Sequence, residues 1–190
     1  MGQWNSFGKK RTVCHPKRVI VIAAEGEITE PEYFQHLNSM SETAHFYIVE
    51  NHGEGSSPRA ILARMKNHLK ATPLGKYDEA WIVLDRDDWN KEEIESIRKW
   101  TQKNKEGKYH FAVSERRFED WLKLHIVGDR PALRKYHFLL CGKNKHIPDD
   151  FVTKERVMRA KDKAKKLYPT SRSVGNVFEI LESFFSNIVP

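Results

Sequence analysis

The chain has 190 residues, a length that suits one α/β domain with a small helical appendage. Hydrophobic residues make up 39% of it and charged residues 31%, which excludes a disordered polymer and an integral membrane protein, since no stretch approaches the roughly 20 apolar residues of a membrane span. The net charge of +7 is unevenly spread, with five Lys or Arg and no acid in residues 1–18, 16 basic and 20 acidic residues in 19–130, and 12 basic and 6 acidic residues in 131–190.

This charge pattern bears on the kind of partner. Solvated surface charge explains any single lysine. Taken together, the basic ends attract a polyanion, whereas the acidic centre repels one unless metal ions neutralise it. The pattern therefore favours a metal-dependent site acting on nucleic acid. Two cysteines, Cys14 and Cys141, suit a reducing compartment and are too few for a metal cluster, so we expect a cytoplasmic protein.

The first predicted elements are a strand and a helix. Residues 18–24 form a short apolar run of mainly β-branched side chains without helical periodicity, which is typical of a buried parallel strand. Thr29 and Glu32 then have the spacing of a capping box, with Pro31 in the first turn, and they predict the start of a helix.

The same alternation continues along the chain. Further strands are predicted over residues 45–50, 78–84 and 109–114, and further helices over residues 58–71, 91–105 and 116–126. Four strand–helix pairs predict an α/β fold with a mostly parallel four-stranded sheet flanked by helices.

After residue 130 the alternation stops, and residues 152–167 and 174–185 have helical patterns. We therefore expect three parts in the chain: a basic N-terminal segment (1–17), an α/β domain (18–130) and a basic helical extension packed on it (131–190).

Acidic residues follow the first strand. Glu25 ends this strand, Gly26 allows the backbone to turn sharply, and Glu30 lies in the first turn of the next helix. In open parallel sheets, ligands bind beyond the carboxyl ends of the strands. A carboxylate that closes a buried strand is hard to explain by packing, so Glu25 is a candidate functional residue. Glu30 could equally well complement the helix dipole.

An Asp-x-Asp pattern follows the third strand. Asp85 ends the strand and Asp87 lies two residues further on, so the two carboxylates point the same way if the chain stays extended. Carboxylates directed at one point repel each other unless a cation lies between them, and Mg²⁺ prefers oxygen ligands. Alone, this pattern is common in solvated turns. At a strand end that adjoins the Glu25 strand, it predicts a metal site.

The helix after the fourth strand carries core residues and a candidate site residue. Phe118, Trp121, Leu122 and His125 fall on one helical face, which we expect to be core, with His125 a hydrogen-bonded core histidine. Glu119 lies at the edge of this face and could reach the metal site.

Three segments resemble the RloB family in order and spacing. They are residues 21–34 (VIAAEGEITEPEYF), 81–88 (WIVLDRDD) and 118–125 (FEDWLKLH), and the likeness continues through residues 159–165 and the closing helix from Asn176. The family is similar to Toprim-containing nucleases, which have a compact α/β domain with a glutamate after the first strand and an Asp-x-Asp motif after a later one.

The resemblance implies roles for particular residues. It places the catalytic Toprim carboxylates on Glu25, Asp85 and Asp87, and a further acidic residue of the related overcoming-lysogenization nucleases on Glu30. We expect Mg²⁺, or Mn²⁺ in its place, as the cofactor. The expected metal ligands are Glu25, Glu30, Asp85, Asp87, Asp88 and Glu119. The expected substrate-binding residues are the basic side chains Arg86, Arg116, Arg117, Lys143, Lys145 and Lys161.

The leading hypothesis is Mg²⁺-dependent cleavage of a phosphodiester bond in DNA or RNA, tRNA included, within a prokaryotic anti-phage defence system. The resemblance implies an ATPase partner of the RloA type that gates the nuclease. No membrane contact is expected, and self-association into a homo-oligomer stays open. Two alternatives remain: a non-catalytic module that binds nucleic acid or docks onto an ATPase, and a metal-dependent phosphohydrolase of small phosphates.

Overall fold

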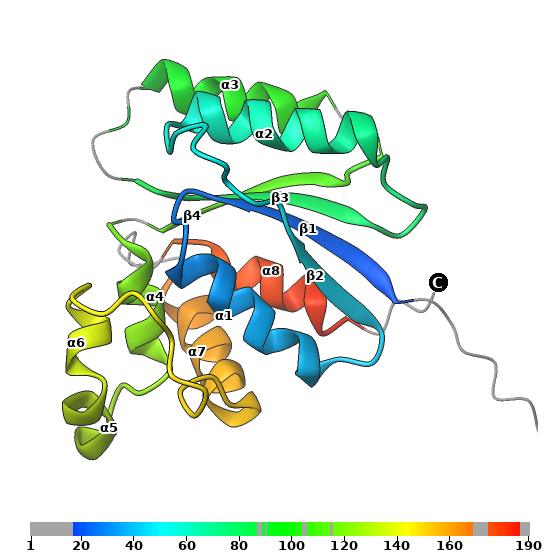
Figure 1. Cartoon of the computed structure of the whole chain (residues 1–190). Coiled ribbons are helices and arrows are strands. Elements are labelled where there is room, and N and C mark those ends of the chain that lie inside the picture. Colours follow the sequence, from blue (N-terminus) through cyan, green and yellow to red (C-terminus); the bar gives the residue numbers. More distant parts are fainter. Residues whose placement is uncertain are drawn as a thin grey trace, which may run out of the picture.

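A parallel β-sheet lies at the centre of the molecule (Figure 1). The computed structural model describes residues 17–86, 89, 91–103, 106–114, 116–168 and 175–186. Its strands are β1 (Arg18–Ala24), β2 (Ala44–Ile48), β3 (Glu79–Asp85) and β4 (Tyr109–Ser114). They lie in the order β2-β1-β3-β4, and each neighbouring pair is parallel. The predicted α/β fold with a parallel four-stranded sheet is confirmed.

Two of the sequence expectations fall on residues outside this description. The basic N-terminal segment is described only at Lys17, and Asp87 and Asp88 are not described. No helix in the described ranges is long and apolar enough to cross a membrane.

Alternate side chains of the central strands enter two separate hydrophobic cores, because successive strand residues point to opposite faces of a sheet. On one face, Ala23 and Ile82 pack under α2 (Pro58–Ala71) and α3 (Lys91–Gln102). On the other face, Ile22 packs in a larger core. Four longer helices contribute to that core: α1 (Thr29–Leu37), α4 (Phe118–Leu124), α7 (Lys154–Leu167) and α8 (Val177–Phe184). Figure 1 shows these two layers on either side of the sheet.

Two short helices were not predicted from the sequence. They are α5 (Arg130–Lys135) and α6 (His137–Leu140), with six and four residues. A helix of this length shows too little periodicity to be recognised. The start of α5 did carry a local signal, because Asp129 accepts a hydrogen bond from the Ala132 amide at 3.0 Å as its N-cap.

The capping box predicted at the start of α1 is wrong. The helix begins at Thr29, but its N-cap is Ile28 and no side chain caps it. The Thr29 hydroxyl instead donates to the Lys145 carbonyl at 2.9 Å, and the Glu32 carboxylate accepts from the Ile147 amide at 2.7 Å. Both side chains therefore anchor a distant loop, a role that local spacing does not reveal.

The outer edge of β4 is closed by residues that precede α8. Asn176 accepts from the Val113 amide at 2.8 Å and donates through its side chain to the Phe111 carbonyl at 3.2 Å. Gly175 has a φ of +63°, and a Cβ at this position would overlap the Val113 carbonyl. These contacts place Asn176 against the sheet edge much as a neighbouring strand would lie.

Candidate functional site

The candidate site lies where β1 and β3 end side by side. From β1 the chain turns into α1 on one face of the sheet, whereas α2 carries it from β2 across β1 to β3 on the opposite face. Such a reversal of strand order opens a crevice beyond the carboxyl ends of the two strands, where ligands bind in open α/β sheets. Glu25 directly follows β1, and Asp85 is the last residue of β3.

A pocket of about 360 Å³ occupies this crevice. Five acidic side chains line it: Glu25, Glu27, Glu30, Asp85 and Glu119. We call it the acidic pocket. Its remaining lining residues are Gly26, Ile28, Thr29, Ser56, Phe118 and Lys145.

Glu25 is held in one orientation. Its Oε2 accepts hydrogen bonds from the Asp85 backbone amide at 3.0 Å and from the Trp89 indole at 3.3 Å. Its own amide donates to the Val83 carbonyl at 3.0 Å, which continues the β1–β3 pairing by one residue. The carboxylate is therefore tied to the end of β3 by backbone as well as side-chain contacts.

Glu30 is buried in the first turn of α1, with 6% of its surface exposed. Its Oε1 accepts from the Gly26 amide at 3.1 Å. Burial, helped by the nearby Glu119 and Glu25 charges and opposed by backbone amides that donate to the carboxylate, raises the pKa of Glu30 to about 7. Gly26 is required here because a Cβ at this position would overlap the Glu30 carboxylate. The requirement is for space, since Gly26 does not have the left-handed backbone conformation that favours glycine.

Asp85 is the most perturbed carboxylate of the pocket. Burial raises its pKa to about 8, with contributions from the Glu30, Glu25 and Glu119 charges, while the Phe118 amide opposes the rise. Its Oδ1 is buried and has no hydrogen-bond partner among the described residues. A buried acceptor in this condition is costly unless a ligand satisfies it.

The acidic pocket fits a hard divalent cation by the chemistry of its donors. Carboxylate oxygens are the ligands that Mg²⁺ prefers. A cation would also relieve the repulsion that, after burial, raises the pKa values of Asp85 and Glu30. Within the described ranges, no three acidic, histidine or cysteine side chains already stand close enough to hold a metal together. Asp87, the expected partner of Asp85, lies outside those ranges.

The predicted basic contacts divide into three groups. Lys145 is exposed and lines the acidic pocket. Arg86 lines a different pocket beside α3. Four others do not line the acidic pocket: Arg116, Arg117, Lys143 and Lys161. Among these, Arg117 donates to the Leu140 carbonyl at 3.2 Å, which ties the start of α4 to the end of α6.

The prediction of His125 as a core histidine is confirmed. Its ring is fully buried, and its Nδ1 lies 3.2 Å from the Trp121 carbonyl, which can only accept, so this nitrogen carries the proton. Its Nε2 accepts from the Tyr33 hydroxyl at 3.1 Å. Burial lowers the pKa of His125 to about 4, so the ring is neutral at physiological pH.

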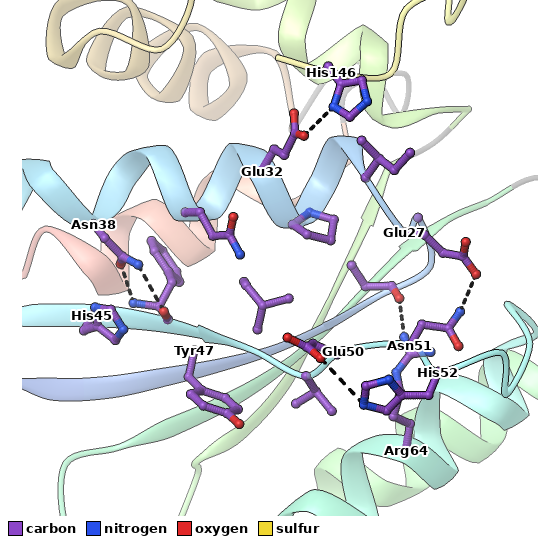
Figure 2. Close-up of a pocket in the computed structure, with 18 residues that line it drawn as sticks. Glu27, Glu32, Asn38, His45, Tyr47, Glu50, Asn51, His52, Arg64 and His146 are labelled. Carbon is purple, nitrogen blue, oxygen red and sulfur yellow. Dashed lines mark hydrogen bonds and ion pairs between the residues drawn. The ribbon is translucent and has the colours of Figure 1, made fainter. Parts of the chain in front are cut away.

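A larger hollow of about 680 Å³ adjoins the acidic pocket and shares Gly26, Glu27 and Ile28 with it (Figure 2). Its acidic side chains have partners: Glu27 accepts from Asn51 at 2.9 Å, and Glu32 pairs with His146 at 2.6 Å. These contacts hold loops against the segment between β1 and α1 and against the first turns of α1, which also line the acidic pocket.

Sequence reasoning missed two side chains that position the site. Trp89 donates to Glu25, and no local pattern marks it. Arg64, only 4% exposed, donates to the carbonyl of Ala24, the residue before Glu25, at 2.5 Å. Arg64 lies three residues after the core residue Ile61 on the same face of α2, so its position in the helical pattern could have marked it as buried.

Comparison with known proteins identifies a family. No curated protein and no solved structure matches the chain. The family of RloB-like proteins matches residues 20–183, a range that includes every residue lining the acidic pocket. Because this match covers most of the chain, the protein belongs to the RloB family.

Proposed function

We propose that the chain is a Mg²⁺-dependent nuclease that cleaves a phosphodiester bond in DNA or RNA. One observation carries the proposal: five carboxylates line one pocket at the β1–β3 crevice, among them Asp85, whose buried Oδ1 has no described partner there. Several carboxylates around one small pocket are unfavourable in a merely structural role, because ionised carboxylates at close range repel one another.

Within this proposal, Asp85 and Asp87 hold the metal, and Glu25 acts as general acid or base or bridges to a second ion. Glu30 and Glu119 are the candidate ligands of that second ion. A bound Mg²⁺ would supply Lewis-acid stabilisation of the phosphate and of the leaving oxygen.

The side chains around the carboxylates have supporting roles. Trp89 and the Asp85 amide keep Glu25 in one orientation. With a pKa of about 7, the Glu30 carboxyl holds a proton in part of the molecules at neutral pH. The exposed Lys145 would offer its ammonium group to a substrate phosphate.

The biological setting that we propose rests on the family. RloB-type proteins imply a prokaryotic anti-phage defence system in which an ATPase partner of the RloA type restrains the nuclease. We expect such restraint because a nuclease that is permanently active would damage the nucleic acids of its own cell.

The first test is a cleavage assay with purified chain. Plasmid DNA, single-stranded DNA and total RNA are incubated with Mg²⁺, Mn²⁺ or EDTA, for the wild type and for Asp85→Asn. Asp120→Asn is the matched control, because it is the same substitution one residue from Glu119 but outside the acidic pocket. We expect metal-dependent cutting that Asp85→Asn abolishes and Asp120→Asn retains.

Two outcomes would contradict the proposal. The first is cutting by Asp85→Asn at the wild-type rate. The second is absence of cutting under every condition, also after addition of the ATPase partner, together with nucleic-acid binding that is unchanged in EDTA. That second result would favour a non-catalytic binding module. Preferential hydrolysis of mononucleotides over polymer would instead identify a phosphohydrolase of small phosphates.

A further inference from the structure

A second pocket lies on the β4 side of the acidic pocket, and its volume is about 570 Å³. Its lining residues come from the segment after β3, from α3 and β4, from Tyr168 after α7 and from the segment before α8. We call it the basic pocket. One residue joins the two pockets: Trp89 lines the basic pocket while its indole donates to Glu25 of the acidic pocket at 3.3 Å.

The charges of the basic pocket oppose those of the acidic pocket. Arg86, Lys91 and Arg98 line it, and Glu95 is its only acidic lining residue among those described. All three cations are exposed. A concave surface with an excess of positive charge attracts phosphates, and it does so directly beside the carboxylates that we propose as the catalytic centre.

Aromatic rings make up another part of the lining. Trp89, Phe111 and Tyr168 line the pocket, and 42% of the Tyr168 side chain is exposed. The Tyr168 ring is held edge-on against the Phe178 ring, with centroids 5.4 Å apart. Tyr168 is thus the exposed ring of the three, while Trp89 and Phe111 are half-buried. An exposed aromatic ring among arginines and lysines is a combination on which an unpaired base stacks while the cations bind the phosphate backbone.

Hydrogen bonds to β4 hold the wall of the pocket that precedes α8. Asn176 makes two side-chain hydrogen bonds with the β4 backbone, at 2.8 and 3.2 Å, and it also donates to Glu179 at 3.0 Å. Gly175 approaches the Val113 carbonyl so closely that no side chain would fit. The shape of this wall is therefore fixed by the sheet itself.

We propose that the basic pocket receives an unpaired nucleotide of a single-stranded DNA or RNA segment and leads the strand to the acidic pocket. The bases of a duplex are paired and stacked within the helix, so they cannot enter a pocket of this size without leaving the stack. The binding step stands on the pocket alone, whereas delivery of the strand to the carboxylates rests on the nuclease function proposed above.

Binding in EDTA tests the inference separately from cleavage. Fluorescence anisotropy is measured for the full chain with a short labelled single strand and with the same sequence as a duplex. We expect the single strand to bind about fivefold tighter or more, the factor that corresponds to stacking of one base.

Two substitutions with matched controls locate the binding. Tyr168→Ala should weaken single-strand binding about fivefold or more, Tyr168→Phe should retain it, and Tyr77→Ala, an exposed tyrosine outside the pocket, should leave it unchanged. Arg98→Ala should lower the salt dependence of binding by a slope of about 0.7, the value for one phosphate contact of a single strand. Lys99→Ala removes a neighbouring exposed charge outside the pocket and should not change this slope.

The outcomes separate this inference from the nuclease proposal. Equal affinity for duplex and single strand would contradict the proposal that the basic pocket binds an unpaired nucleotide, and so would wild-type binding by both Tyr168→Ala and Arg98→Ala. Either result would count against the basic pocket even if Asp85-dependent cutting is observed. Single-strand binding that follows Tyr168 and Arg98 in a chain that cuts nothing would support the pocket and count against the nuclease.

Discussion

At the scale of single residues, the carboxylates of the acidic pocket carry the functional argument. Burial and mutual repulsion raise the pKa of Asp85 to about 8 and that of Glu30 to about 7. A carboxyl group with a higher pKa in the folded than in the unfolded protein holds its proton more tightly in the folded state. It stabilises the fold fully at a pH below its unfolded pKa, and this contribution is lost as the pH rises through its folded pKa. Ionised carboxylates in the acidic pocket therefore destabilise the folded protein at neutral and alkaline pH.

Substituting Asp85 should consequently stabilise the protein. Asp85→Asn is expected to raise the free energy of unfolding by about 1–2 kcal/mol at about pH 9, a value discounted from the full pKa shift because the pocket is open to solvent. At about pH 3 the gain should nearly vanish, since Asp85, with an ordinary pKa of 3.8, is then mostly protonated in the unfolded protein as well as in the folded one. Urea unfolding at both pH values, with Asp120→Asn as control, measures the difference. Destabilisation by Asp85→Asn at alkaline pH would contradict this account of the pocket.

A divalent cation should relieve the same repulsion. At a Mg²⁺ concentration about 100 times its Kd, binding would stabilise the folded protein by about 2.7 kcal/mol, which raises the melting temperature of a chain of this size by about 5–10 °C. The shift should be much smaller in Asp85→Asn, which removes one ligand charge. Differential scanning fluorimetry checks both, and an equal shift in the two proteins would place the cation elsewhere.

At the scale of elements, a buried polar pair joins α1 to α4. The Tyr33 hydroxyl on α1 donates to His125, just after α4, and both side chains are fully buried within the larger core. Three aromatic rings surround Tyr33 edge-on, with centroids 5.3–6.2 Å away: Phe34, Phe118 and Trp121. Because α1 carries Glu30 and α4 carries Glu119, this contact sets the distance between two walls of the acidic pocket.

The His125 pair predicts a loss of stability in acid. The pKa of this imidazole is lowered from 6.5 to about 4, so its contribution is complete above pH 6.5 and is lost as the pH falls through about 4. The full shift corresponds to about 3 kcal/mol. Urea unfolding of wild type and His125→Gln between these pH values measures it. The wild type should lose more stability than the variant over this interval, and parallel curves would contradict a neutral buried imidazole.

At the scale of the whole molecule, a buried arginine connects the beginning of the sheet to the last described helix. Arg18 at the start of β1 is 1% exposed and pairs with Glu79 of β3 at 3.1 Å. It also donates to the Ser183 hydroxyl at 3.1 Å, to the Ser183 carbonyl and to the Ser186 hydroxyl at 3.0 Å. Residues more than 160 positions apart are thereby held together at the end of the sheet opposite the acidic pocket.

Removing this cation should be costly. Arg18→Met is expected to lower the free energy of unfolding by about 3–5 kcal/mol, because Glu79 then keeps a partly buried charge without its cation. Lys17→Met, the exposed neighbour, should cost less than about 0.5 kcal/mol. The double variant Arg18→Met/Glu79→Gln should recover part of the loss. Chemical denaturation of the wild type, these three variants and the single variant Glu79→Gln tests this. Losses in the double variant that equal the sum of the two single losses would exclude a direct interaction.

The sequence by itself determined the class of fold and the ends of the strands that carry the site. Apolar β-branched runs alternating with amphipathic segments can bury their surfaces only as a covered parallel sheet, which is why β1 and β4 begin and end at their predicted residues. The same logic applies to Glu25 and Asp85. Residues at the carboxyl ends of adjacent parallel strands lie close together wherever the strands pair. The proximity of Glu25 and Asp85 therefore follows from the pairing of β1 with β3.

Only the tertiary structure decided the surroundings of these carboxylates. The contacts of Trp89 with Glu25, of Lys145 with Thr29 and of Asn176 with β4 join residues far apart in the chain, and each depends on how helices and loops pack in three dimensions. The misread capping box at Thr29 has the same origin, because a local pattern cannot show that a distant loop offers better partners. Raised pKa values follow from burial and from charges contributed by several elements, and both exist only once the chain has folded.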